Sequence, residues 1–213
     1  MNYTELFNGT KDRLKKANAK FESEETELAF TLGERTHYEK EFDFRIPDDL
    51  FDLYSSYNGL EFNWSIQDNG EVVAGYFAFS HFLDLLDNDS EGKLWVDWYE
   101  PNDIEEIKAH RIFETLIGSD YYVTIKIEPD GAYQLFYVPE GSVNHGGSKK
   151  LSKIPLTIDE YFKAITGYYG VYSIRHNLHK QEFYEDASKF IPEMERLRRL
   201  IPDFQQPKLS PKF

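Results

Sequence analysis

The apolar positions of this chain follow two periods, one typical of helices and one typical of strands. Residues 3–20 carry apolar side chains at loose helical spacing, which predicts an amphipathic helix. A sharper signal follows Pro47, because Leu50, Leu53 and Tyr57 lie on one face of a helix that would begin there. Proline suits the first helical turn, so we expect a well-defined helix with these three side chains buried.

Strand patterns concentrate in the middle of the chain. Residues 71–79 and 94–99 are rich in β-branched and aromatic side chains. Residues 121–127 and 132–138 flank the turn sequence Glu-Pro-Asp-Gly at 128–131, which predicts an antiparallel hairpin. Apolar and polar side chains alternate along the first strand of this hairpin. That alternation predicts a sheet covered by helices on one face only.

Two further segments carry ambiguous or interrupted patterns. Within the Glu-rich stretch 21–45, apolar residues alternate over positions 28–32, as in a short strand. An apolar stripe at helical spacing runs through residues 183–200, and Pro192 lies inside it. Because proline interrupts a helix, we expect the last helix to be kinked or split there. After residue 202 we expect a frayed tail.

The chain is strongly acidic, and the charge is unevenly distributed. It contains 38 Asp and Glu against 24 Lys and Arg, a formal net charge of −14. Residues 61–145 hold 17 of the acidic side chains and only 4 of the basic ones. Such a field repels nucleic acid and steers basic proteins toward the surface. Taken alone, the negative charge is explained more simply by a role in keeping the protein soluble than by partner binding.

We predict a mostly exposed acidic surface within this segment, because unpaired carboxylates are rarely buried. We add one tryptophan, since Trp is a favoured interface residue and Trp95 and Trp98 would face opposite sides of one strand. The predicted partner-binding residues are Asp84, Asp87, Asp89, Glu91, Asp97, Trp98, Glu100, Asp103, Glu105 and Glu106.

Candidate chemistry is sparse, and we expect no enzyme, no cofactor and no metal. The absence of cysteine excludes disulfides, thiolate nucleophiles and Cys-ligated zinc. His176 and His179 have a spacing that could serve a metal, but no accompanying carboxylate motif is present. Paired carboxylates are expected by chance in so acidic a chain, and the Gly-Gly-Ser stretch near residue 147 lacks phosphate-loop spacing.

Localisation is expected to be cytoplasmic. The first residues lack a basic stretch followed by an apolar run, so no secretory signal is predicted. The longest apolar runs fall far short of a membrane span, and we expect no membrane association.

Three short motifs, in this order, resemble the SUKH superfamily, which includes Smi/Knr cell-wall-synthesis regulators and many bacterial immunity proteins. The first, Ile-Pro-Asp-Asp-Leu at 46–50, leads to Asn-Gly at 58–59. The second runs from Ile-Gly-Ser-Asp at 117–120 through the predicted hairpin. The third, Leu-Thr-Ile-Asp-Glu-Tyr-Phe at 156–162, is similar to the helix that closes the domain and has a capping-box pattern.

The resemblance implies an α+β fold, with a mainly antiparallel sheet flanked by helices, over residues 1–168. Residues 169–213 would then be a helical extension packed on the same domain. It also implies a non-catalytic protein-binding domain, foremost an immunity protein that neutralises a basic, nuclease-type toxin. Two alternatives stay open: a regulatory scaffold of the cell-wall-synthesis type, and an enzyme with an unrecognised site.

Overall fold

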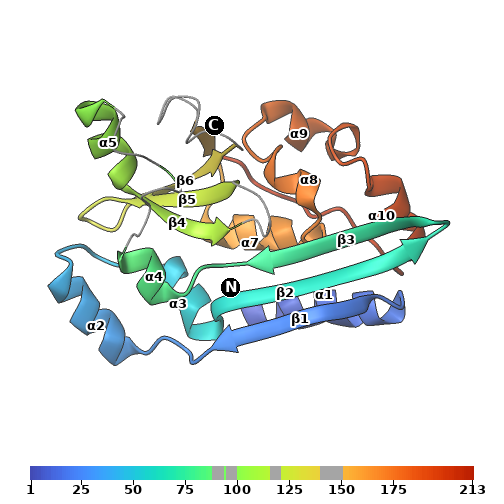
Figure 1. The fold of residues 1–213 in the computed structure, drawn as a ribbon, viewed down its shortest axis with the longest axis horizontal. Coiled ribbons are helices and arrows are strands. Elements are labelled where there is room, and N and C mark those ends of the chain that lie inside the picture. Colours follow the sequence, from blue (N-terminus) through green and yellow to red (C-terminus); the bar gives the residue numbers. More distant parts are fainter. Residues whose placement is uncertain (88–93, 95–99, 116–120, 140–150) are drawn as a thin grey trace.

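A computed structural model describes residues 1–87, 94, 100–115, 121–139 and 151–213, and it is an α+β fold with two antiparallel sheets flanked by helices (Figure 1). The strands are β1 (Lys20–Glu27), β2 (Asn58–Asp68), β3 (Glu71–Ala78), β4 (His110–Thr115), β5 (Tyr122–Ile127), β6 (Tyr133–Val138) and β7 (Ser152–Ile154). The helices are α1 (Tyr3–Lys16), α2 (Leu32–Glu41), α3 (Asp48–Ser56), α4 (Phe82–Asp87), α5 (Pro101–Lys108), α7 (Ile158–Gly167), α8 (Tyr172–Arg175), α9 (Gln181–Glu185), the 3₁₀ helix η2 (Ala187–Lys189) and α10 (Met194–Leu200). In the described part of the chain, no helix has the length and apolar character needed to cross a membrane.

The first sheet has the strand order β1-β2-β3. Its central hairpin turns through Asn69 and Gly70, both with positive φ, and Asp68 pairs with Glu71 beside the turn. Positive φ at both central positions is the geometry that suits the twist of a two-residue hairpin. Side chains alternate in burial along β2, and Trp64 is among the buried ones. One face of this sheet therefore belongs to the core.

The second sheet has the strand order β4-β5-β6-β7 and contains the predicted hairpin. Tyr122 pairs with Val138 and Ile127 with Tyr133, so the prediction of antiparallel pairing across residues 128–131 is confirmed. Gly131, with φ +87°, supplies the left-handed conformation that closes the turn.

The prediction that only one face of this hairpin is covered is wrong. Val123 and Ile125 enter the main core, as the alternation indicates. On the opposite face, Tyr122 packs in a smaller cluster with Ile107 of α5, and Thr124 is fully buried. Helix α5 thus covers a face that sequence alternation assigns to solvent.

The expected single sheet is instead two sheets that meet at one bridge, between Phe79 and Glu114. The outer edge of β3 is already occupied, because the Tyr76 amide donates to the Gly170 carbonyl. Gly75 makes this close approach possible, since a Cβ there would collide with the Tyr169 carbonyl oxygen. With that edge filled, β4 reaches β3 only at its end.

The helix after Pro47 forms as predicted and buries Leu50 and Leu53. Tyr57 is only half-buried, because the helix ends at Ser56 and Tyr57 is extended. Residues 28–32 are not a strand: Leu28 lies in a connection and Leu32 begins α2, whose capping box is formed by Thr31 and Glu34. The capping interactions outweigh the short apolar alternation.

The C-terminal residues pack along both sheets. The apolar stripe of residues 183–200 is divided into α9, η2 and α10, so the expected split near Pro192 is confirmed. Residues beyond 202 keep contacts with the domain: the Lys212 amide donates to the Pro155 carbonyl at 2.7 Å, and Phe204 packs on Tyr169.

Candidate functional site

A cavity of about 690 Å³ lies where the two sheets diverge. Residues 25–27 at the end of β1, the start of β2 and the end of β3 form its floor and one wall. Helix α4 and strand β4 form the other wall. We call this cavity the acidic groove, because five carboxylates line it. They are Glu25, Glu27, Glu61, Asp84 and Asp87.

The carboxylates of the acidic groove have no counter-ion within the described part of the chain. Among the described residues, none of the five forms an ion pair, although the cavity adjoins a sheet with several paired acids. The adjacent Glu24 is paired with Lys11, and Asp68 on the same sheet is paired with Arg199. Counting the described residues, the groove is therefore a local excess of negative charge.

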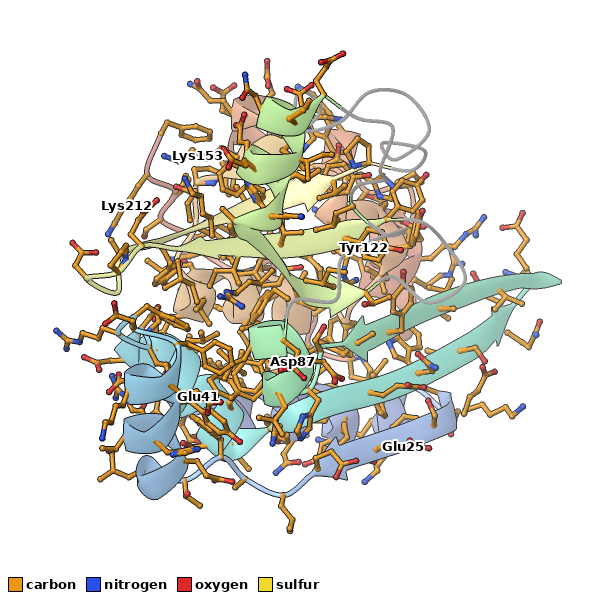
Figure 2. All side chains as sticks on the ribbon, turned by 60° about the vertical axis from the view of Figure 1, so that its left-hand side comes forward. Glu25, Glu41, Asp87, Tyr122, Lys153 and Lys212 are labelled. Carbon is orange, nitrogen blue, oxygen red and sulfur yellow. The ribbon has the colours of Figure 1, made fainter. Side chains whose placement is uncertain are left out.

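The chain topology places two of these carboxylates directly opposite each other. Glu25 of β1 and Glu61 of β2 are cross-strand partners, and like charges in this position repel. They lie on the face of the sheet away from α1, since Phe62 on the other face packs against Phe7 of that helix. Figure 2 shows Glu25 on β1, with Asp87 on α4 above that sheet.

A buried asparagine fixes the end of the groove. The side-chain Oδ1 of Asn58 accepts from the Phe82 backbone amide at 2.9 Å, and the side-chain Nδ2 donates to the Leu28 backbone carbonyl at 3.0 Å. Nδ2 of Asn58 also lies 3.1 Å from His81 Nε2. Asn58 is 6% exposed. It therefore ties the chain after β1 to the start of α4, next to the groove residues Gly59 and His81.

Exposed leucines flank the acidic groove at the same end. Leu28 follows the groove residue Glu27 and is 89% exposed. Leu83 precedes the groove residue Asp84 and is 39% exposed. These side chains add exposed apolar area beside the groove, which a protein partner could cover.

The structure divides the predicted partner-binding residues. Asp84 and Asp87 are exposed and line the acidic groove. Glu100 precedes α5 and Asp103, Glu105 and Glu106 lie on it; Asp103 is half-buried and the others are exposed. Helices α4 and α5 lie on opposite sides of β4, so these residues form two groups (Figures 1 and 2). Asp89, Glu91, Asp97 and Trp98 lie outside the described residues.

Sequence reasoning missed the three glutamates that β1 and β2 bring to the groove, namely Glu25, Glu27 and Glu61. The first two lie in a stretch with no clear period. Glu61 lies just before the alternating sequence Phe-Asn-Trp-Ser-Ile at 62–66, which is a strand signal that would have placed it opposite another strand.

The histidine pair serves packing in the described part of the chain. The His179 ring stacks on Tyr137 with centroids 5.5 Å apart, and the His176 ring packs against Tyr121. Burial lowers the pKa of His179, and the neighbouring Lys180 and His176 lower it further. Among the described residues, no three His, Asp or Glu side chains come together as a metal site requires.

A second constellation, the junction pair of Glu114 and Arg175, lies where the sheets meet. Both side chains are fully buried. Arg175 Nε donates to Glu114 Oε2 at 2.9 Å, and the other guanidinium nitrogens donate to the carbonyls of Gly170 and Tyr76. The Tyr161 hydroxyl also donates to Glu114. Every strong donor and acceptor of the pair thus has a partner.

The environment of the junction pair sets its charge state. Burial alone would lower the pKa of Arg175, but the Glu114 carboxylate beside it raises that pKa above its ordinary value. Burial raises the pKa of Tyr161 well above its ordinary value, and the charge of Glu114 adds to the increase. Arg175 therefore stays charged and Tyr161 stays a neutral donor, which suits a structural role.

Comparisons of the whole chain with known proteins found no match: no protein-family model, no curated protein and no solved structure is similar to it at a significant level.

Proposed function

We propose that this protein is a non-catalytic binding domain that captures a basic protein through the acidic groove. The observation that carries the proposal is the set of five groove carboxylates with no ion-pair partner among the described residues. Lysine and arginine side chains of a partner would supply the missing countercharge. Desolvated charge pairs of this kind contribute to specificity and to the rate of encounter.

The spread of the carboxylates supports a protein rather than a single cation. They come from β1, β2 and α4, and no three of them converge as metal ligands do within the described chain. The exposed leucines at the groove's end offer apolar area, which a protein interface uses and a small cation does not. A nucleic acid would be repelled by the same charges.

We propose further that the captured protein is a toxin, and that this chain is its immunity protein. The resemblance to the SUKH superfamily favours this, and the acidic groove is consistent with it, since the surfaces of nucleases are commonly basic. An immunity protein works by occluding its toxin, which fits a groove with carboxylates on both walls.

Capture from the native strain, followed by reconstitution, tests the proposal. Wild-type protein, the groove variant E25K/D87K and the control variant E182K/E185K are used as baits. Both variants change the net charge equally, and Glu182 and Glu185 are exposed acids of α9 outside the groove. Partners retained by wild type and control but lost by the groove variant are then purified.

The expected result is a basic partner whose association rate with wild type falls steeply as salt rises from low to moderate ionic strength. Expressed alone, that partner should arrest growth of a host, and co-expression of wild type but not of the groove variant should restore it. Equal binding of the partner by the groove variant and the control variant would refute the proposal that the groove binds it. A groove-dependent partner that is harmless to the host would instead favour the regulatory scaffold.

A further inference from the structure

The outer edge of β1 borders the acidic groove and pairs with no strand in the described structure. Strand β1 bonds to β2 on one side, and no described residue bonds to its backbone on the other. It lies at the margin of the sheet in Figure 1. A free edge presents a row of N–H and C=O groups that another extended chain can pair with.

We propose that the partner delivers an extended basic segment that adds to this edge as a further strand. The inference rests on the proposed function, and it specifies which part of the partner binds and how. Main-chain hydrogen bonds to β1 would hold the segment. Its lysines or arginines, at every second position, would face the groove carboxylates.

The side chains of β1 favour such an occupant over an apolar one. Glu22, Glu25 and Thr26 are exposed, and Glu25 repels Glu61 across the strand pair. Alternate side chains of an added strand point to the same face of the sheet. One basic residue near Glu25 would therefore relieve a repulsion that exists in the free protein.

The same charges disfavour a second copy of this chain as the occupant. Pairing two β1 edges would bring the glutamates of one copy beside those of the other. Like charges directly opposite each other destabilise strand pairing. The edge thus discourages self-association and remains open to a strand of opposite charge.

The exposed leucines indicate where the segment ends. Leu28 directly follows β1, so a strand paired along β1 would pass beside it at one end. An eight-residue strand spans about 26 Å at roughly 3.3 Å per residue, which matches the length of β1. An apolar residue at the end of the segment would cover Leu28.

Two synthetic peptides test strand addition. The first is a capped octapeptide of alternating lysine and valine, and the second is the same peptide N-methylated at its two central residues. Consecutive N–H groups of a strand point to opposite edges of that strand. Methylating two neighbouring residues therefore removes one hydrogen-bond donor from each edge of the peptide and keeps its charge and side chains. Affinity for wild type, E25K/D87K and E182K/E185K is measured at low salt, with amide hydrogen exchange of β1.

We expect the unmethylated peptide to bind wild type and the control variant, and to bind the groove variant at least tenfold more weakly. N-methylation should weaken binding at least tenfold, and the β1 amides that do not bond to β2 should gain protection only with the unmethylated peptide. Three outcomes would overturn strand addition. They are an affinity of the methylated peptide within twofold of that of the unmethylated one, gained amide protection outside β1, and no binding by either peptide. The groove-dependent partner of the capture experiment would still stand, so failure here is distinct from failure of the proposed function.

Discussion

Carboxylates occupy two opposite environments in this molecule, and the acids of α4 lie only 27 and 30 residues before Glu114 in the sequence. At the junction pair, Glu114 is dry and fully compensated by Arg175 and Tyr161. In the acidic groove, Asp84 and Asp87 are exposed and unpaired in the described structure, with Glu25 facing Glu61 nearby. The Glu114 carboxylate thus serves the fold, whereas the groove carboxylates are available to a partner. Net charge alone, −14, does not distinguish the two.

The largest effect should come from breaking the junction pair. Arg175→Met leaves Glu114 as an uncompensated buried charge, and the free energy of unfolding should fall by about 3–5 kcal/mol. Urea denaturation at pH 7 measures it. Arg196→Met is the control, because Arg196 pairs with Glu71 at the surface and its loss should change stability by less than about 1 kcal/mol. Equal losses of unfolding free energy for the two substitutions would show that the buried pair matters no more to stability than a surface pair.

Removing both charges at the junction sharpens the same comparison. The double variant E114Q/R175M holds no uncompensated charge, so it should be more stable than Arg175→Met alone. A double-mutant cycle with Glu114→Gln should give a coupling energy of at least about 1 kcal/mol. A coupling near zero would mean that the two groups stabilise the fold independently.

His110 provides an intermediate case, a buried titratable side chain next to a cation. Burial, together with the smaller effect of the Lys126 charge, lowers the pKa of His110 to about 4. The unfolded chain therefore binds this proton near pH 6.5 and the folded chain only near pH 4, so stability falls as pH drops through that window. Relative to His110→Gln, wild type should lose about 2 kcal/mol between pH 7.5 and pH 5. If the unfolding free energies of the two proteins changed in parallel with pH, the His110 imidazole would not be the cause of the pH dependence.

The smallest effect should come from the groove and should have the opposite sign. Glu25→Gln removes repulsion with Glu61, so the unfolding free energy should rise by about 0.2–1 kcal/mol at low salt and by less at high salt. Glu24→Gln, one residue away, removes the ion pair with Lys11 and should lower stability slightly. Destabilisation by both substitutions would show that Glu25 serves the fold.

Sequence patterns predicted the elements whose signals are local. The hairpin of residues 121–138 and the helix after Pro47 form because turn chemistry and apolar period agree there. The second sheet could not be anticipated, since it depends on Gly170 taking the edge of β3 from almost 100 residues away in the chain. The second covered face of β5 depends in the same way on α5.

The candidate site was predictable only in part, for a related reason. Asp84 and Asp87 lie in a segment with few cations, and composition identifies such a segment. Glu25 is indistinguishable from Glu24 in the sequence, yet Lys11 reaches only Glu24. Whether a carboxylate is paired is a property of the tertiary fold, so composition overestimates the role of some acids and misses others.

The junction pair also limits the order in which parts of the fold can form during synthesis. Glu114 leaves the ribosome 61 residues before Arg175, its counter-ion. At about 5–20 residues per second, that interval is roughly 3–12 s. During it the carboxylate has no guanidinium to accompany it into the interior, so β4 cannot close against β3 in its final form. The N-terminal sheet can hydrogen-bond earlier, whereas completion of the junction waits for residues 170–175 to emerge.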